Sequence, residues 1–162
     1  MGCGIFICTL AILSGCSTFG SKSPSPKIAQ FKQDTSVGTE DISIAAVGLV
    51  GVPYRYGGNT PKGGFDCSGL IVYVYNKAAA IKLPRTIQQM SNQGRSIDGQ
   101  APAPGDLVFF NTTGEKYSHA GIYVGHGRFV HAPSAGGTVR LDYITSPYWA
   151  AKFTEARRLT PQ

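Results

Sequence analysis

The start of the chain is an uncharged apolar segment that limits how much of the sequence can enter a fold. Residues 1–15 contain no charged side chain, and the run from Ile5 to Leu13 is apolar except for Thr9. This run is shorter than the roughly 20 residues that a membrane-spanning helix needs. It is typical of an export signal that is removed after translocation, and a buried strand or helix is the less favoured alternative because a polar stretch follows.

The apolar run ends in Leu13-Ser14-Gly15-Cys16, which resembles the bacterial lipobox. In a lipobox a signal peptidase cuts before a cysteine that carries a lipid, so we expect lipidation of Cys16 and a lipoprotein signal peptide over residues 1–15. Ser17 resembles the residue found at this position in lipoproteins sent to the outer membrane of two-membrane bacteria. We therefore predict an exported protein that is lipid-anchored to the membrane facing the periplasm, with the outer membrane favoured.

The amino-acid composition changes twice after Cys16. Residues 17–38 are rich in Ser, Lys, Pro, Gln and Thr and poor in apolar side chains, which is the composition of a solvated linker. Apolar residues return from Asp41 onward, and the chain of 162 residues is long enough for one core but too short for two ordinary domains. We predict a lipidated N-terminus and flexible tether over 16–40 and one domain over 41–162.

The net charge of the chain is +6, and all of it lies after residue 15. A basic surface suits an anionic partner such as a cell-wall polymer or lipid head groups, although a basic surface without a specific partner fits equally well. Nucleic acid is a poor candidate, because the sequence contains no run of Lys and Arg and no recognised nucleic-acid motif.

Apolar periodicity and turn residues predict helices in the first half of the domain and strands in the second. Helices are expected over 41–50, 67–79 and 86–93, the second with Asp66 as its N-cap. Strands are expected over 107–110, 119–125, 128–132, 138–141 and 153–159. This order favours an α+β fold in which N-terminal helices pack on an antiparallel β-sheet.

The cysteines suggest a reactive group. Removal of residues 1–15 leaves Cys16 and Cys67, and lipidation of the first leaves Cys67 unpaired. An unpaired thiol in an exported protein is either a buried small hydrophobe or a reactive group. Cys67 stands at the start of an expected helix, where backbone N–H groups and the helix dipole stabilise a thiolate and an adjacent imidazolium would add a full charge.

Two histidines on neighbouring strands are candidates to serve this thiol. If Gly125-His126-Gly127 forms a three-residue turn, His131 lies opposite Gly121, and His119 is diagonal to it on the face that also carries Phe129. His131 can then orient the ring of His119 as the third member of a triad. A two-residue turn without a bulge would instead separate the two histidines.

Each histidine taken alone is better explained as a structural residue, and only the combination with an unpaired Cys67 favours catalysis. His126 stands between two glycines at a turn and is expected to be exposed. A zinc site made of Cys67, His119 and His131 is a weaker alternative, because these residues lack the paired close spacing of common structural sites. We therefore predict neither a metal nor a cofactor.

The motifs around these residues carry a family resemblance. In chain order they are Tyr54-Arg55-Tyr56-Gly57-Gly58, Phe65-Asp66-Cys67-Ser68-Gly69-Leu70, Leu83-Pro84-Arg85-Thr86, Pro104-Gly105-Asp106-Leu107, His119-Ala120-Gly121-Ile122-Tyr123 and Phe129-Val130-His131-Ala132. Over roughly residues 41–160 the chain resembles the NlpC/P60 family of papain-like peptidoglycan peptidases. The resemblance implies a papain-like NlpC-type fold, with Cys67 as nucleophile, His119 as general base and His131 as the orienting residue.

The resemblance also implies roles for residues around the triad. Tyr54 matches a family tyrosine that helps to line the oxyanion region, and Ser68 and Arg85 are expected to bind substrate. The implied reaction is hydrolysis of the stem peptides of peptidoglycan, with the D-alanyl to meso-diaminopimelate crosslink favoured and the D-glutamyl to diaminopimelate bond as the alternative.

A different class of function is a non-catalytic wall-binding lipoprotein, which the basic charge and the lipobox support equally well. The complete triad argues against it, and the order of Cys before His argues against an acyl transferase that acts on lipids. The expected partners are peptidoglycan stem peptides and, through the lipid on Cys16, a membrane. We expect a monomer.

Overall fold

The computed structural model describes residues 1–2, 37–97 and 99–159. Cys16, nearly all of the predicted signal peptide and most of the predicted tether therefore lie outside the described residues. Within the described ranges, no helix has the length and apolar character required to cross a membrane.

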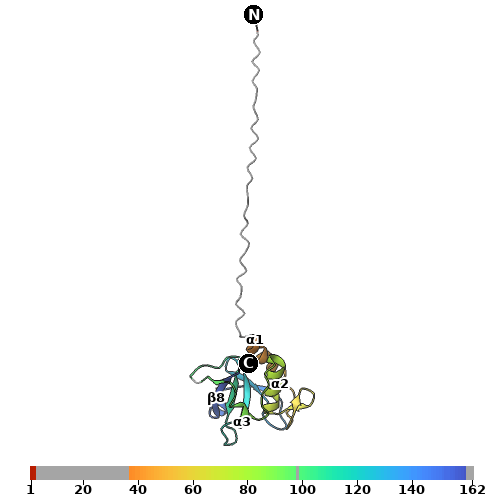
Figure 1. Ribbon diagram of the computed structural model, residues 1–162, viewed down its shortest axis with the longest axis vertical. Helices are drawn as coiled ribbons and strands as arrows, with labels where there is room; N and C mark the ends of the chain where they lie inside the picture. Colours follow the sequence, from red (N-terminus) through yellow and green to blue (C-terminus); the bar gives the residue numbers. More distant parts are fainter. Residues whose placement is uncertain (3–36, 98, 160–162) are drawn as a thin grey trace. The chain divides into compact units, whose positions relative to one another are not determined.

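Helices come first in the chain and an antiparallel sheet follows. The large sheet has the strand order β3-β8-β4-β5-β6-β7, and β1 and β2 form a separate pair. This arrangement confirms the expected α+β fold (Figure 1). The elements are α1 (Val37–Val47), β1 (Asn59–Thr60), β2 (Gly64–Phe65), α2 (Cys67–Ala79), α3 (Ile87–Met90), β3 (Arg95–Ser96), β4 (Leu107–Phe110), β5 (His119–Gly125), β6 (Arg128–His131), β7 (Arg140–Tyr143), α4 (Pro147–Ala150) and β8 (Phe153–Arg158).

The sheet is buried on both faces because its strands alternate between two apolar clusters. Helices α1 and α2 pack against each other and against β5, and Figure 1 shows them side by side. The sheet residues that share a cluster with these helices include Leu107, Phe109, Ala120, Ile122 and Val130. The second cluster contains Val108, Phe110, Phe129, Trp149 and Ala156.

Helix α2 has the bounds that the sequence predicts. The side chain of its N-cap, Asp66, accepts a hydrogen bond from the N–H of Gly69 at 2.7 Å, and Ala80 ends the helix in the left-handed conformation with φ 55°. Helix α1 begins at Val37, earlier than the expected start near Asp41. Helix α3 is shorter than the expected helix over 86–93: it covers Ile87–Met90 and has Thr86 as its N-cap.

The β5–β6 hairpin differs from the expected three-residue turn. Gly125 pairs with Arg128, so the turn has two residues, His126 and Gly127, with φ of 53° and 71°. The register shifts between Tyr123 and Gly125, which makes Val124 a bulge. This bulge restores the alternation that the three-residue turn would have preserved, and His126 is exposed as expected.

The register beyond the bulge is the one that the sequence predicts. Ile122 pairs with Val130, so the next position places His131 opposite Gly121. A Cβ atom at Gly121 would lie 2.6 Å from a ring carbon of Phe129 and 3.2 Å from the Cβ of His131. The absence of a side chain at Gly121 therefore leaves room for His131 on this face.

The C-terminal elements depart most from the expectation. Strand β7 covers Arg140–Tyr143 instead of 138–141. Helix α4 was not predicted; it begins with Pro147, whose fixed φ suits the first helical position, and it contributes Trp149 to the second cluster.

Gly69 gives a test of how closely α2 approaches the preceding loop. A Cβ atom at this position would overlap the carbonyl oxygen of Gly58 and lie 3.1 Å from the carboxylate of Asp66. We expect Gly69→Ala to lower the free energy of unfolding by about 2 kcal/mol, because backbone must move to admit the methyl group. Gly48→Ala is the matched control, since a Cβ there meets only ordinary contacts. Urea unfolding measures both, and equal stabilities would contradict the close packing.

Candidate active site

Cys67 is the first residue of α2 and lines a cavity of about 600 Å³. Three of the residues that the sequence assigns to the site, Tyr54, Ser68 and Arg85, line the same cavity. Its remaining wall includes Tyr56, Thr86, Gln88, Tyr117 and Ser118. The cavity therefore brings together the predicted nucleophile and the predicted substrate-binding residues from three separate segments.

Asp66 ties these segments together. Its carboxylate forms an ion pair with Arg85 at 2.6 Å and accepts hydrogen bonds from the N–H groups of Gly69 and Gly57 at 2.7 and 2.9 Å. Arg85 also donates to the hydroxyl of Ser68. Burial opposes ionisation of Asp66, but the hydrogen bonds from Arg85 and Gly69 outweigh it and hold the pKa of this carboxyl below its ordinary value.

The thiol of Cys67 is half-buried and free. Burial and the charge of Asp66 raise the pKa of Cys67, and the backbone N–H groups of Cys67 and Ser68 offset only part of this rise. The direction is opposite to the expectation that the start of the helix favours a thiolate. Tyr54 lies near the thiol, and burial together with the charges of Cys67 and Asp66 raises the pKa of the Tyr54 hydroxyl.

His119 and His131 form a buried pair. Nε2 of His119 and Nδ1 of His131 are 2.9 Å apart, and the two rings are almost perpendicular, at 84°. His131 is fully buried and His119 is 5% exposed. Burial, with smaller contributions from His131 and Arg140, lowers the pKa of His119 to about 3. Burial lowers the pKa of His131 to about 4, although the hydrogen bond to Asp142 opposes this shift. Both rings are therefore neutral at neutral pH.

Cys67 and His119 come from elements that pack directly on each other, α2 and β5. Ser118, the residue before His119, lines the cavity that contains Cys67. Among the contacts of the described residues, no hydrogen bond joins the Cys67 thiol to His119. Catalytic hydrogen bonds are commonly long in the absence of substrate and tighten in the Michaelis complex.

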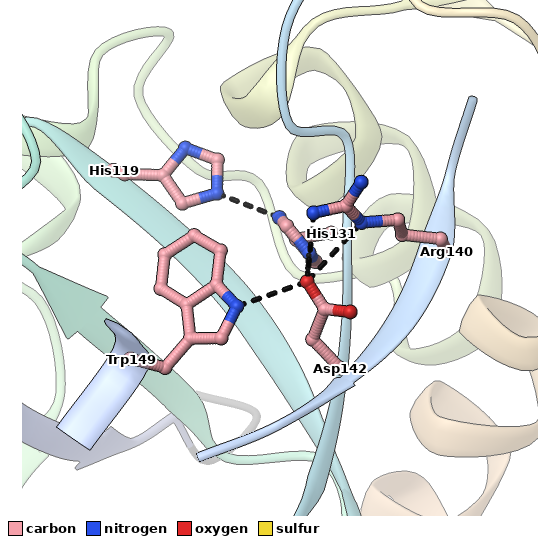
Figure 2. A network of polar contacts seen from close by, with 5 residues as sticks. All are labelled: His119, His131, Arg140, Asp142 and Trp149. Atoms are coloured by element: carbon pink, nitrogen blue, oxygen red, sulfur yellow. Dashed lines mark hydrogen bonds and ion pairs between the residues drawn. The ribbon is translucent and has the colours of Figure 1, made fainter. Parts of the chain in front are cut away.

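Sequence reasoning missed three residues next to the histidines. Nε2 of His131 lies 2.9 Å from Oδ2 of Asp142, and the same oxygen accepts from the indole N–H of Trp149 at 2.9 Å and from Arg140 at 3.0 and 3.1 Å (Figure 2). Strand β7 pairs with β6 so that Arg140 lies opposite His131 and Asp142 opposite Phe129. The alternating charges of Arg140 and Asp142 were a usable signal, but the predicted strand ended at Leu141.

Across residues 37–97 and 99–159, no group of three or more His, Cys, Asp or Glu side chains is arranged to hold a metal ion. The imidazole nitrogens that face each other in the His119–His131 pair are engaged in their mutual hydrogen bond.

The fold agrees with the family comparison. The model of the NlpC/P60 family matches residues 51–158, and the chain belongs to this family. The structure is similar to the crystal structure of the NlpC/P60 domain of the peptidoglycan hydrolase SagA, with a TM-score of 0.65, 30% identity, and coverage of 76% of this chain and 100% of that one. The expected family and its fold are confirmed.

Two curated relatives are similar to this chain. One is a gamma-DL-glutamyl hydrolase of Bacillus subtilis (strain 168), 45% identical over 123 residues, which are 74% of this chain and 30% of the relative. The other is the murein DD-endopeptidase MepS/murein LD-carboxypeptidase of Escherichia coli (strain K12), 38% identical over 109 residues, which are 67% of this chain and 56% of the relative. The chain thus spans less than two thirds of either relative.

The buried histidines give a test at acidic pH. Both pKa values lie below the ordinary value of about 6.5, so the unfolded chain binds protons that the folded chain rejects. The free energy of unfolding is therefore fully retained above about pH 6.5 and falls, by up to about 1.4 kcal/mol per pH unit for each histidine, as the pH drops toward 4.

We expect His119→Gln to remove about half of this slope and His126→Gln, at the exposed turn, to leave it unchanged. Urea unfolding at a series of pH values between about 7 and 4.5 measures the slopes. A slope in His119→Gln equal to that of the parent chain would show that His119 is not held neutral by burial.

Proposed function

We propose that this chain is a cysteine-type endopeptidase that hydrolyses the stem peptides of peptidoglycan. The observation that carries the proposal is the position of Cys67 at the start of α2, in a cavity of about 600 Å³ whose wall includes Ser118, the residue before His119. A nucleophile, a base and a residue that orients the base are the components of thiol-dependent acyl transfer. The names of the two curated relatives, a gamma-DL-glutamyl hydrolase and a murein endopeptidase, support the same class of substrate.

The proposed reaction begins with attack of the Cys67 sulfur on a peptide carbonyl carbon. Because the pKa of Cys67 is raised and that of His119 is lowered, the thiol and the imidazole are both neutral before substrate binds. The thiol proton therefore passes to His119 as the carbon–sulfur bond forms. The N–H of Cys67 and the hydroxyl of Tyr54 would stabilise the oxyanion.

Collapse of the tetrahedral intermediate breaks the carbon–nitrogen bond. His119 gives its proton to the leaving amine, and an acyl group remains on Cys67. His119 then takes a proton from water as the water oxygen attacks the thioester. When the carbon–sulfur bond breaks, His119 returns this proton to the sulfur and the thiol is restored. No group outside the chain and the substrate other than water is required.

The favoured bond is the D-alanyl to meso-diaminopimelate crosslink, in line with the 38% identity to a murein DD-endopeptidase. The D-glutamyl to diaminopimelate bond is the second candidate, because the 45% identical relative is a gamma-DL-glutamyl hydrolase. The first bond joins two stem peptides and the second lies within one. Arg85 lines the cavity with its side chain 44% exposed, so it is the candidate partner for a carboxylate of either substrate.

The proposed location follows from the N-terminal sequence. Residues 1–15 would direct export, Cys16 would carry the lipid, and a tether that ends where α1 begins at Val37 would hold a monomeric peptidase domain at the periplasmic side of the outer membrane. We expect cells that express the full chain to incorporate labelled palmitate into it, and Cys16→Ser to abolish the label. If Cys16→Ser kept the label and Cys3→Ser lost it, the lipid would be on Cys3 and the proposed anchor at Cys16 would be wrong.

Digestion of purified crosslinked muropeptide dimers tests the activity. We expect the full chain to release monomers and Cys67→Ala to lose at least about 10³-fold in rate, because only residual transition-state stabilisation remains without the nucleophile. Mass spectrometry identifies the products.

Fragments cut between D-glutamate and diaminopimelate would favour the second bond. Equal rates for the parent chain and Cys67→Ala would reject thiol catalysis. Binding of intact sacculi by both proteins without any cleavage would instead support a wall-binding lipoprotein.

A further inference from the structure

A single carboxylate oxygen, Oδ2 of Asp142, accepts several hydrogen bonds next to the histidine pair. Oδ2 of Asp142 accepts from Nε1 of Trp149 at 2.9 Å and from Nε and Nη2 of Arg140 at 3.1 and 3.0 Å, and it lies 2.9 Å from Nε2 of His131. Figure 2 shows the five side chains, with His119 at the far end of the chain of contacts. These residues come from β5, β6, β7 and α4.

The contacts determine where each proton lies. Burial opposes ionisation of Asp142, but hydrogen bonds from His131 and Trp149 outweigh it and lower the pKa of this carboxyl. An ionised carboxylate only accepts hydrogen bonds, so Nε2 of His131 must carry a proton. His131 is neutral, which leaves its Nδ1 as an acceptor and makes Nε2–H of His119 the donor in the 2.9 Å contact between the rings.

The protonation of Nδ1 of His119 follows from the same contacts. His119 is neutral and carries its proton on Nε2, so its Nδ1 has a free lone pair. Figure 2 shows Nδ1 on the side of the ring away from His131. A base that must accept the proton of Cys67 needs this tautomer, because Nδ1–H could not accept it.

We propose that Asp142, held in place by Arg140 and Trp149, is a positioning residue that fixes the tautomers of His131 and His119 and so presents Nδ1 of His119 as the base for Cys67. The inference rests on the proposed function for its catalytic consequence. The proton arrangement itself rests on the contacts of the five side chains and on the neutral state of the two buried rings.

The groups that face the pair have opposing effects. Asp142 on β7 favours a proton on the histidines, whereas Arg140 on the same strand disfavours it, and His131 on β6 disfavours charge on His119. Trp149 on α4 stacks on His119 with ring centroids 5.6 Å apart and contributes no charge. Loss of Asp142 would therefore leave a buried pair with a nearby guanidinium and no acceptor for Nε2–H of His131.

Two substitutions of Asp142 distinguish its role as a hydrogen-bond acceptor from the effect of its negative charge. In Asp142→Asn, the amide oxygen is expected to stay at the position of Oδ2, because the donors of Trp149 and Arg140 surround it, and it still accepts from His131. Asp142→Leu keeps the number and branching of the side-chain heavy atoms and offers no acceptor. The second variant frees Nε2 of His131 to give up its proton, so that Nδ1–H of His131 donates to Nε2 of His119 and the proton of His119 moves to Nδ1.

Nitrogen-15 NMR of the histidine rings in the full chain measures the tautomers without reference to activity. We expect an unprotonated Nδ1 on His119 in the parent chain and in Asp142→Asn, and a protonated or exchanging Nδ1 in Asp142→Leu. Asp41→Leu, which makes the same change at an exposed carboxylate, is the control for the spectra. An unprotonated Nδ1 on His119 in folded Asp142→Leu, or a protonated one in the parent chain, would overturn the inference.

Kinetics on muropeptide dimers tests the consequence. We expect Asp142→Leu to lower kcat by about 100-fold or more with little change in KM, because a base in the wrong tautomer costs chemistry and not binding. Asp142→Asn should stay within about 10-fold of the parent chain. A fall in kcat for Asp142→Leu with an unchanged tautomer would also overturn the inference. If the parent chain cleaves no muropeptide, the proposed function fails, whereas the NMR result still decides the role of Asp142 in the tautomers.

Discussion

The carboxylate of Asp66 at the start of α2 is the interaction on which the geometry of the cavity depends. It caps the helix through Gly69, holds the preceding loop through Gly57 and pairs with Arg85 from a segment further along the chain. These contacts place Cys67 at a fixed point between the loop and the cavity wall. Burial raises the pKa of the Cys67 thiol and the charge of Asp66 raises it further, so the group that positions the proposed nucleophile also disfavours its ionised form.

Burial also disfavours the charged forms of the two histidines, His119 and His131. His131 is fully buried and His119 is 5% exposed, and burial keeps both rings neutral. A neutral pair can hold one defined arrangement of protons, because each ring has one donor and one acceptor nitrogen. The contact between His131 and Asp142 gives that arrangement a direction, because His131 donates to the carboxylate and His119 then donates to His131.

The parts of the structure that sequence could predict are those fixed by local chemistry. The bounds of α2 follow from its N-cap and from the apolar run behind it, and the strands of the two histidines follow from their alternation. Asp142 escaped prediction because β7 is displaced by two residues from the predicted strand and because helix α4, which brings Trp149 to the site, is short. The neutral state of Cys67 and of the histidines also escaped, since it depends on burial by residues that are distant in the sequence.

The bulge at Val124 restricts how the β5–β6 hairpin can change in length. Successive residues of a strand point to opposite faces, so a single insertion between His119 and His131 would turn one ring toward the helices. The two-residue turn keeps both rings on one face only because Val124 supplies an unpaired residue. Insertions and deletions in this hairpin are thus compatible with the histidine pair in steps of two, or when a residue gained by the turn is lost from the bulge.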